Sequence, residues 1–288
     1  MSEQMHPPES KERGKNVEIN FIFARHSEKT SGNVYNPDSQ DISDAPLSER
    51  GKSMARDFGK TLKNAGLRPK GGYITDIERT GETLREIFKT AEPIDQIKRE
   101  YLSFPVELTK YTEQRFQEIY EQEREQVMQK QHPGKLFDSL TPAEQEGVSW
   151  QATEPALAWF LDLDTMWPDS DKKSEPYQQA SHVAYKLRRF IELPEKMEND
   201  RRIILLSIGH KTQTEAFLAY VLKGLKGKTL SKRLGSIGGG LHVMESWCLS
   251  IKTNDMGNKF ISIFFREKEY EVSLDKLNEL AQAYSADN

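Results

Sequence analysis

The fold begins with the run Val17-Glu18-Ile19-Asn20-Phe21-Ile22-Phe23-Ala24-Arg25-His26-Ser27. The residues Val17, Ile19, Phe21, Ile22 and Phe23 are β-prone, and they predict a short buried strand. The strand ends abruptly at the charged residues Arg25 and His26. A buried strand with a charged carboxyl end is typical of the ligand-binding edge of an α/β sheet.

Further strand and helix patterns alternate along the chain. Helices are predicted from Ser48 to Gly66, from near Asp76, over about 179–198, after Gly209-His210 and from Ser273. Strands are predicted at Tyr73-Ile74-Thr75, at Ile203-Ile204-Leu205-Leu206-Ser207, over about 241–251 and over about 259–267. The last two strands are expected to form a hairpin at the sheet edge. This alternation predicts an α/β fold, a three-layer sandwich in which helices flank a mainly parallel central sheet.

Two segments depart from this regular pattern. Residues 1–16 are polar and charged, and we expect them to form a disordered leader before a single domain at 17–288. Between about 108 and 180 the alternation is lost, and we expect a helical insertion or cap there.

Charged residues directly follow three of the predicted strands. They are Arg25 and His26 after the first strand, Arg79 in the first turn of the second helix, and His210 at the start of a later helix. Because the carboxyl ends of parallel strands share one sheet edge and helix N-termini favour anions, these side chains are expected to converge. A neutral imidazole among arginines suits attack on a phosphoryl group, because arginine binds phosphoryl oxygens bidentately.

The chain resembles the histidine phosphatase superfamily, which includes cofactor-dependent phosphoglycerate mutases and many phosphatases. Four motifs in the family's order carry the resemblance: Phe23-Ala24-Arg25-His26-Ser27-Glu28-Lys29-Thr30, Pro46-Leu47-Ser48-Glu49-Arg50-Gly51, Thr75-Asp76-Ile77-Glu78-Arg79-Thr80-Gly81-Glu82-Thr83 and Ser207-Ile208-Gly209-His210. The resemblance implies that His26 accepts the phosphoryl group, that Arg25 and Arg79 bind phosphate, and that His210 is the second pocket histidine.

The family pattern also implies further phosphate donors and a general acid. Thr30 and Asn33 are the small polar residues available as extra phosphate donors. The family supplies its acid from the segment after the Arg79 helix, where Glu107 lies at about the right distance and Glu100 is its rival.

Two positions are informative when the chain is compared with the family that it resembles. Lys211 stands where the acid-phosphatase and phytase branch has an Asp, which favours the phosphoglycerate mutase-like branch. Ser27 stands where the family usually has Gly, and its Cβ would crowd the turn if the position required positive φ.

Composition narrows the class of partner. The 288 residues include 41 Lys and Arg and 45 Asp and Glu, and the net charge of −4 gives no general attraction to nucleic acid or anionic membranes. We therefore expect a small phosphorylated substrate, with no nucleic acid and no membrane as partner.

The lone cysteine, Cys248, excludes an internal disulfide and suits the cytoplasm. The other histidines have no partner at metal-ligand spacing, so neither a metal nor another cofactor is expected.

Three functions fit these residues. The first is a metal-independent phosphomonoester hydrolase that works through a phosphohistidine on His26. A phosphoglycerate mutase-like phosphoryl transferase is the nearest alternative, and it would return the phosphoryl group to a second hydroxyl. A phosphate-binding or scaffold protein with weakened catalysis is the third.

Overall fold

The computed structural model describes residues 13–29, 46–75, 77–91, 97–98, 109–166, 174–210 and 212–287. Within them the elements run in the order β1 (Glu18–Arg25), α1 (Glu49–Asn64), β2 (Gly71–Tyr73), α2 (Glu78–Phe88), β3 (Ile97–Lys98), α3 (Lys110–Gln131), α4 (Pro142–Met166), α5 (Glu175–Glu192), β4 (Arg202–Gly209), α6 (Gln213–Val221), α7 (Leu230–Gly235), β5 (Ser246–Thr253), β6 (Lys259–Phe265), β7 (Lys268–Glu271) and α8 (Leu274–Asp287).

The described strands form one seven-stranded sheet in the order β3-β2-β4-β1-β5-β6-β7. The strands β3, β2, β4 and β1 pair in parallel, whereas β5, β6 and β7 continue the sheet in antiparallel pairings. The sheet is therefore mixed, and the predicted mainly parallel sheet is not confirmed. The predicted hairpin of β5 and β6 is present, but β5 pairs directly with β1, and β7 forms the outer edge.

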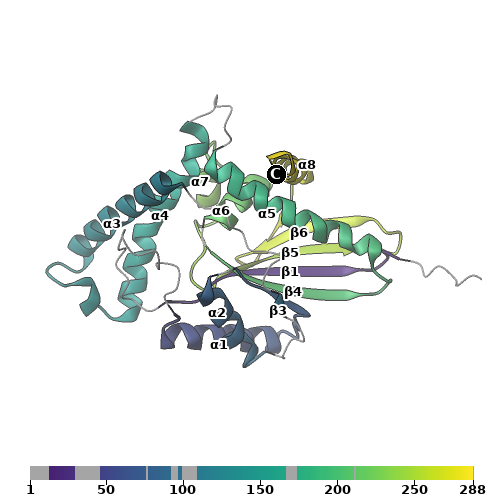
Figure 1. The fold of residues 1–288 in the computed structure, drawn as a ribbon, viewed down its shortest axis with the longest axis horizontal. Coiled ribbons are helices and arrows are strands. Elements are labelled where there is room, and N and C mark those ends of the chain that lie inside the picture. The colour runs from purple at the N-terminus through teal and green to yellow at the C-terminus, as the bar shows by residue number, and fades with distance from the viewer. Residues whose placement is uncertain are drawn as a thin grey trace, which may run out of the picture.

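Helices cover both faces of the sheet, so the molecule has three layers (Figure 1). Alternate residues of β1 enter two separate cores: Phe21 and Phe23 pack with α5, α6 and α8, while Ile22 and Ala24 pack with α1 and α2. The strand β1 is buried along nearly its whole length because both of its faces are covered.

The helices that flank the site begin where the sequence predicts. The Ser48 hydroxyl accepts a hydrogen bond from Gly51 N and so caps α1, as expected for an N-cap serine. Arg79 lies in the first turn of α2, and His210 lies three residues before α6. The strand β2 occupies Gly71–Tyr73 rather than Tyr73–Thr75, because Gly71 and Gly72 pair with Leu205 and Leu206 of β4.

The segment expected to be an insertion is mostly helical where it is described, with a turn at 132–136 between its two long helices. The helices α3 and α4 pack against each other and extend from the sheet on the side where β1 ends (Figure 1). The next helix, α5, lies along the sheet and belongs to the larger core. None of the helices in the described ranges combines the length and apolar character that a bilayer crossing requires.

The end of the expected leader pairs with the main body. Gly14 N donates to the Met197 carbonyl at 2.9 Å, and Lys15 N donates to the Asn199 side chain at 2.9 Å. Residues 13–16 are thus held by the turn before β4, and the remainder of the leader, 1–12, lies outside the described residues.

Candidate active site

The carboxyl ends of β1 and β4 bring the two motif histidines together. His26 follows β1, His210 follows β4, and His26 N donates to the carbonyl of Gly209 at 2.9 Å. The centroids of the two imidazole rings lie 5.0 Å apart. Convergence of residues 184 positions apart follows from the parallel pairing of β1 with β4, which aligns Arg25 with Gly209.

Both predicted arginines join this pair. Arg79 Nη2 lies 3.5 Å from His210 Nδ1. Arg25 immediately precedes His26, and together with Arg79 it disfavours protonation of both histidines. The remaining predicted site residues, Thr30, Asn33 and Glu107 with its rival Glu100, lie outside the described residues.

The ring of His26 is held in one tautomer. Its Nδ1 lies 2.7 Å from the carbonyl of Ser27, and because a carbonyl only accepts, Nδ1 carries the proton. The other nitrogen, Nε2, then has a free lone pair. Burial, followed by the charges of Arg25, His210 and Arg79, holds the His26 pKa well below its ordinary value, so the nucleophilic neutral form dominates at neutral pH.

His210 is also neutral at neutral pH. Arg79 can only donate, so His210 Nδ1 accepts from it, and His210 Nε2 donates to Thr75 Oγ1 at 3.0 Å. Burial and the two arginines lower the His210 pKa to about 3. His210 is therefore neutral at neutral pH, and the negative charge of a bound anion would raise its pKa again.

A pair of buried threonines orients His210, and the sequence did not single them out. The Thr80 hydroxyl accepts from Thr75 N at 3.2 Å and donates to the carbonyl of Ile77 at 2.8 Å. Thr75 is thereby held in place, with its own hydroxyl 3.0 Å from His210. Both residues stand in the Arg79 motif, but a hydroxyl-to-imidazole contact leaves no sequence pattern of its own.

The nitrogens of the Arg25 guanidinium differ in their hydrogen bonding among the described residues. Its Nη1 donates to the carbonyl of Leu241 at 2.8 Å, whereas its buried Nε has no hydrogen-bond partner among the described residues. Burial lowers the Arg25 pKa and the buried carboxylate of Glu215 opposes this shift, so the guanidinium stays charged. A buried donor without a partner is suited to an oxyanion ligand.

Ser27 fits its position without strain, so the expected crowding is not found. Its backbone is not in the left-handed region. Its hydroxyl donates to the carbonyl of Gly51 at 2.6 Å, and its N donates to Thr83 Oγ1 at 3.1 Å. Ser27 therefore ties the nucleophile loop to α1 and α2.

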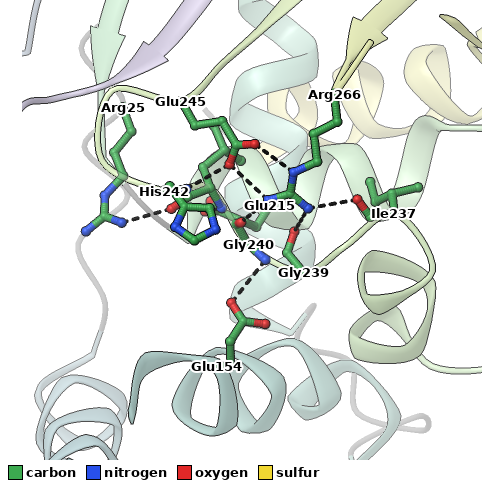
Figure 2. Close-up of polar contacts among 10 residues, drawn as sticks. Arg25, Glu154, Glu215, Ile237, Gly239, Gly240, His242, Glu245 and Arg266 are labelled. Atoms are coloured by element: carbon green, nitrogen blue, oxygen red, sulfur yellow. Dashed lines mark hydrogen bonds and ion pairs between the residues drawn. The ribbon is translucent and has the colours of Figure 1, made fainter. Parts of the chain in front are cut away.

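The helix α4 contacts helix α1 and the loop before β5 through residues spaced four apart. Glu146 pairs with Arg50, which also pairs with Glu28 beside the nucleophile loop. Trp150 stacks on His242 with ring centroids 3.5 Å apart. One turn further, Glu154 Oε1 accepts from Gly240 N at 3.2 Å (Figure 2).

A third cation lies close to the two arginines of the site. Lys29 lies near Arg25 and Arg79, and partial burial together with these two cations lowers its pKa. Among the described residues, no group of His, Cys, Asp and Glu is arranged to hold a metal ion. The described pocket offers donors and cations, which is the chemistry that binds a phosphoryl group.

Several solved structures are remotely similar to this chain. A YhfR structure from Bacillus stearothermophilus is 13% identical, with a TM-score of 0.47 over 87% of this chain and 97% of that one. A mycobacterial glucosyl-3-phosphoglycerate phosphatase complexed with VO3 is 16% identical, with a TM-score of 0.44 over 85% of this chain and 98% of its own. The protein histidine phosphatase SixA complexed with tungstate is 12% identical, with a TM-score of 0.39 over 88% and 96%. No curated protein matches the sequence.

The family model gives the most direct comparison. The model for the histidine phosphatase superfamily (branch 1) matches residues 21–139, a segment that contains Arg25, His26 and Arg79. His210 lies outside this segment, and the sheet places it beside His26. The match over residues 21–139 supports the resemblance to the histidine phosphatase superfamily that the motifs indicate.

Proposed function

We propose that this chain is a metal-independent phosphomonoester hydrolase that works through a phosphohistidine on His26. The observation that carries the proposal is the buried, neutral His26, which is fixed by the Ser27 carbonyl with its Nε2 lone pair free. An imidazole in this state is a ready nucleophile toward phosphorus.

In the proposed reaction, His26 Nε2 forms a bond to phosphorus while the bond to the leaving oxygen breaks. Arg25 and Arg79 hold the non-bridging oxygens through the charge build-up of the transition state. An incoming dianion raises the pKa of His210, so that Nδ1 takes up a proton from solvent and donates to a phosphoryl oxygen instead of accepting from Arg79. Water later attacks the phosphohistidine, which releases inorganic phosphate and regenerates neutral His26.

The leaving oxygen requires a proton, and we propose Glu107 as its source, with Glu100 as the rival. Loss of a general acid costs about 10²–10⁴-fold in rate, but only when the leaving group is a poor one. Glu107→Gln should therefore slow hydrolysis of an alkyl phosphate by that factor and leave p-nitrophenyl phosphate hydrolysis nearly unchanged. The same pattern in Glu100→Gln instead would move the role to Glu100.

The substrate we propose is a small phosphorylated molecule of the cytoplasm. The net charge of −4 offers no general attraction to nucleic acid or to an anionic membrane, and the cations concentrate locally around His26. Burial raises the Cys248 pKa to about 12, so the only cysteine has no role as a nucleophile.

The test is hydrolysis of p-nitrophenyl phosphate without added metal between pH 5 and 8, with orthovanadate as inhibitor. His26→Ala should abolish turnover, whereas the control His132→Ala, at a turn after α3, should retain it. Quenching the reaction in mild base should trap an acid-labile phosphoenzyme in the wild type and in His132→Ala, but not in His26→Ala.

Each other outcome selects one alternative. A protein that becomes labelled but releases phosphate only to a second hydroxyl is a mutase-like transferase. A folded protein that binds phosphate but never becomes labelled is a phosphate-binding protein, and that result contradicts the proposed hydrolase.

A further inference from the structure

The carbonyl that anchors Arg25 belongs to a glycine-rich loop, residues 237–241, which we call the glycine loop. Gly238 and Gly239 have φ values of +96° and +84°, which favour glycine. A Cβ on Gly240 would collide with the side chain of Leu157 on α4. The loop thus lies directly against α4, and its backbone path requires glycine.

Every polar backbone atom of the Gly240-Leu241 pair has a partner (Figure 2). Gly240 N donates to Glu154 Oε1 at 3.2 Å, and Leu241 N donates to Glu215 Oε1 at 3.0 Å. The Gly240 carbonyl accepts from Arg266 Nη2 at 2.7 Å, while the Leu241 carbonyl accepts from Arg25. The orientation of the Leu241 carbonyl toward Arg25 is therefore fixed by side chains from α4, from α6 and from the turn after β6.

Arg266, in the turn after β6, holds more of this loop than any other side chain in Figure 2. Its guanidinium donates to the carbonyls of Ile237 at 2.8 Å, Gly239 at 3.4 Å and Gly240 at 2.7 Å. It also forms a two-pronged ion pair with the Glu245 carboxylate, at 2.6 and 2.9 Å. The fork geometry of arginine suits such a set of acceptors, and lysine cannot reproduce it.

Glu245 connects Arg266 to Arg25 by a second route. Its carboxylate accepts from His242 N at 2.8 Å, and its backbone carbonyl accepts from Arg25 N at 3.0 Å. The backbone of Arg25 and its guanidinium are thus both attached to the segment that Arg266 holds.

We propose that Arg266 is a positioning residue: through the glycine loop and Glu245, it holds the Leu241 carbonyl that aims Arg25 at a bound phosphoryl group. Arg266 itself touches no substrate. Glu154 holds the same loop from the opposite side, so α4 contributes to the alignment of Arg25. This inference rests on the proposed phosphate-binding role of Arg25.

The first test measures inorganic phosphate binding by calorimetry and p-nitrophenyl phosphate kinetics in Arg266→Gln. A small misplacement of a binding group costs up to about 100-fold, so we expect about a 10- to 100-fold rise in the phosphate Kd and in KM. Arg266→Lys should bind nearly as weakly, because a lysine cannot bridge the three carbonyls and Glu245. Arg202→Gln is the matched control, since Arg202 pairs with Glu18 at the opposite end of the sheet.

A double-mutant cycle separates positioning from general stability. If Arg266 acts through Arg25, Arg266→Gln should add nothing to the phosphate Kd of Arg25→Ala. If Arg266 had only a structural role, Arg266→Gln would lower the unfolding temperature. Its phosphate Kd would then either equal that of the wild type, or rise by the same factor with Arg25 present and with Arg25→Ala. Either of these two binding results overturns the proposal.

Glu154 provides an independent test if Arg266→Gln fails to fold. Glu154→Gln keeps a carbonyl oxygen for Gly240 N and should retain phosphate affinity, whereas Glu154→Leu should lose it by about 10-fold, the usual effect of one strong hydrogen bond. Equal affinity in both variants contradicts the proposal. A wild-type protein that binds no phosphate removes the proposed function and this inference together, whereas unchanged binding in Arg266→Gln removes the inference alone.

Discussion

At the scale of single residues, the predicted site separates into side chains and their supports. Arg25, His26, Arg79 and His210 were predicted from motifs, because reactive side chains must be of specific types. The Leu241 carbonyl and the Thr75 hydroxyl were not predicted, since any residue has a carbonyl and threonine is common. Such supports depend on which segments approach one another, and this is decided by the tertiary fold.

Ser27 gives a prediction at this scale. Its hydroxyl satisfies the buried carbonyl of Gly51 at 2.6 Å, and Ser27 is fully buried. Ser27→Gly, which introduces the residue usual in the family, should lower the free energy of unfolding by about 1–3 kcal/mol, because a buried acceptor loses its partner and the chain gains freedom. Urea unfolding measures this change.

Activity provides the second readout for the same variant. Because Ser27 causes no strain, Ser27→Gly should not raise kcat. A variant that is both as stable as the wild type and faster would show that the serine crowds the nucleophile loop.

At the scale of elements, helices were predicted more accurately than strands. The helix α1 begins after its Ser48 cap and ends before Gly66, because capping and apolar spacing are local signals. The position of β2 was wrong by two residues, since its glycines are poor strand formers and pair only because β4 lies beside them. The order and direction of strands in the sheet depend on long-range pairing, so the predicted parallel character was overestimated.

Two helical glycines give a matched prediction for packing between elements. A Cβ on Gly59 of α1 would collide with the Ile87 carbonyl and the Thr90 hydroxyl at the end of α2, whereas a Cβ on Gly147 of α4 would meet open space. Gly59→Ala should destabilise the protein by about 1–3 kcal/mol through overpacking. Gly147→Ala should stabilise it by about 0.5–1 kcal/mol, because alanine is the better helix former.

Thermal unfolding of the two variants checks this pair. Equal shifts in Tm would show that α1 and α2 do not approach as closely as described. Arg79 lies at the other end of α2, so phosphate affinity in Gly59→Ala also reports whether this packing supports the site.

At the scale of the whole molecule, buried histidines make stability depend on pH. His210 has a pKa of about 3, His182, stacked on Tyr284, has a pKa of about 4, and the His26 pKa is also lowered. Burial is the main cause in each case. Since the unfolded histidine titrates near 6.5, the unfolded state binds more protons below that pH.

The contribution of these histidines to the free energy of unfolding should therefore be fully present above about pH 6.5, and it should fall as the pH is lowered toward 4. Each such histidine contributes at most about 1.4 kcal/mol per pH unit. Urea unfolding between pH 7 and 5 isolates this effect from carboxylate titration. The slope of the free energy of unfolding against pH should be smaller in His210→Gln and in the presence of bound phosphate. A wild-type free energy of unfolding that does not change between pH 7 and 5 would contradict the buried neutral state of these histidines.

The mixed sheet gives the molecule two unlike ends. Because β5 and β6 are antiparallel, the turn at Arg266 returns to the end where β1 finishes, while the turn 254–258 lies at the other end, beside Glu18. Met256 is exposed at that distant turn. Immobilising the protein on a surface through an affinity tag inserted there would leave the phosphate pocket facing the solution.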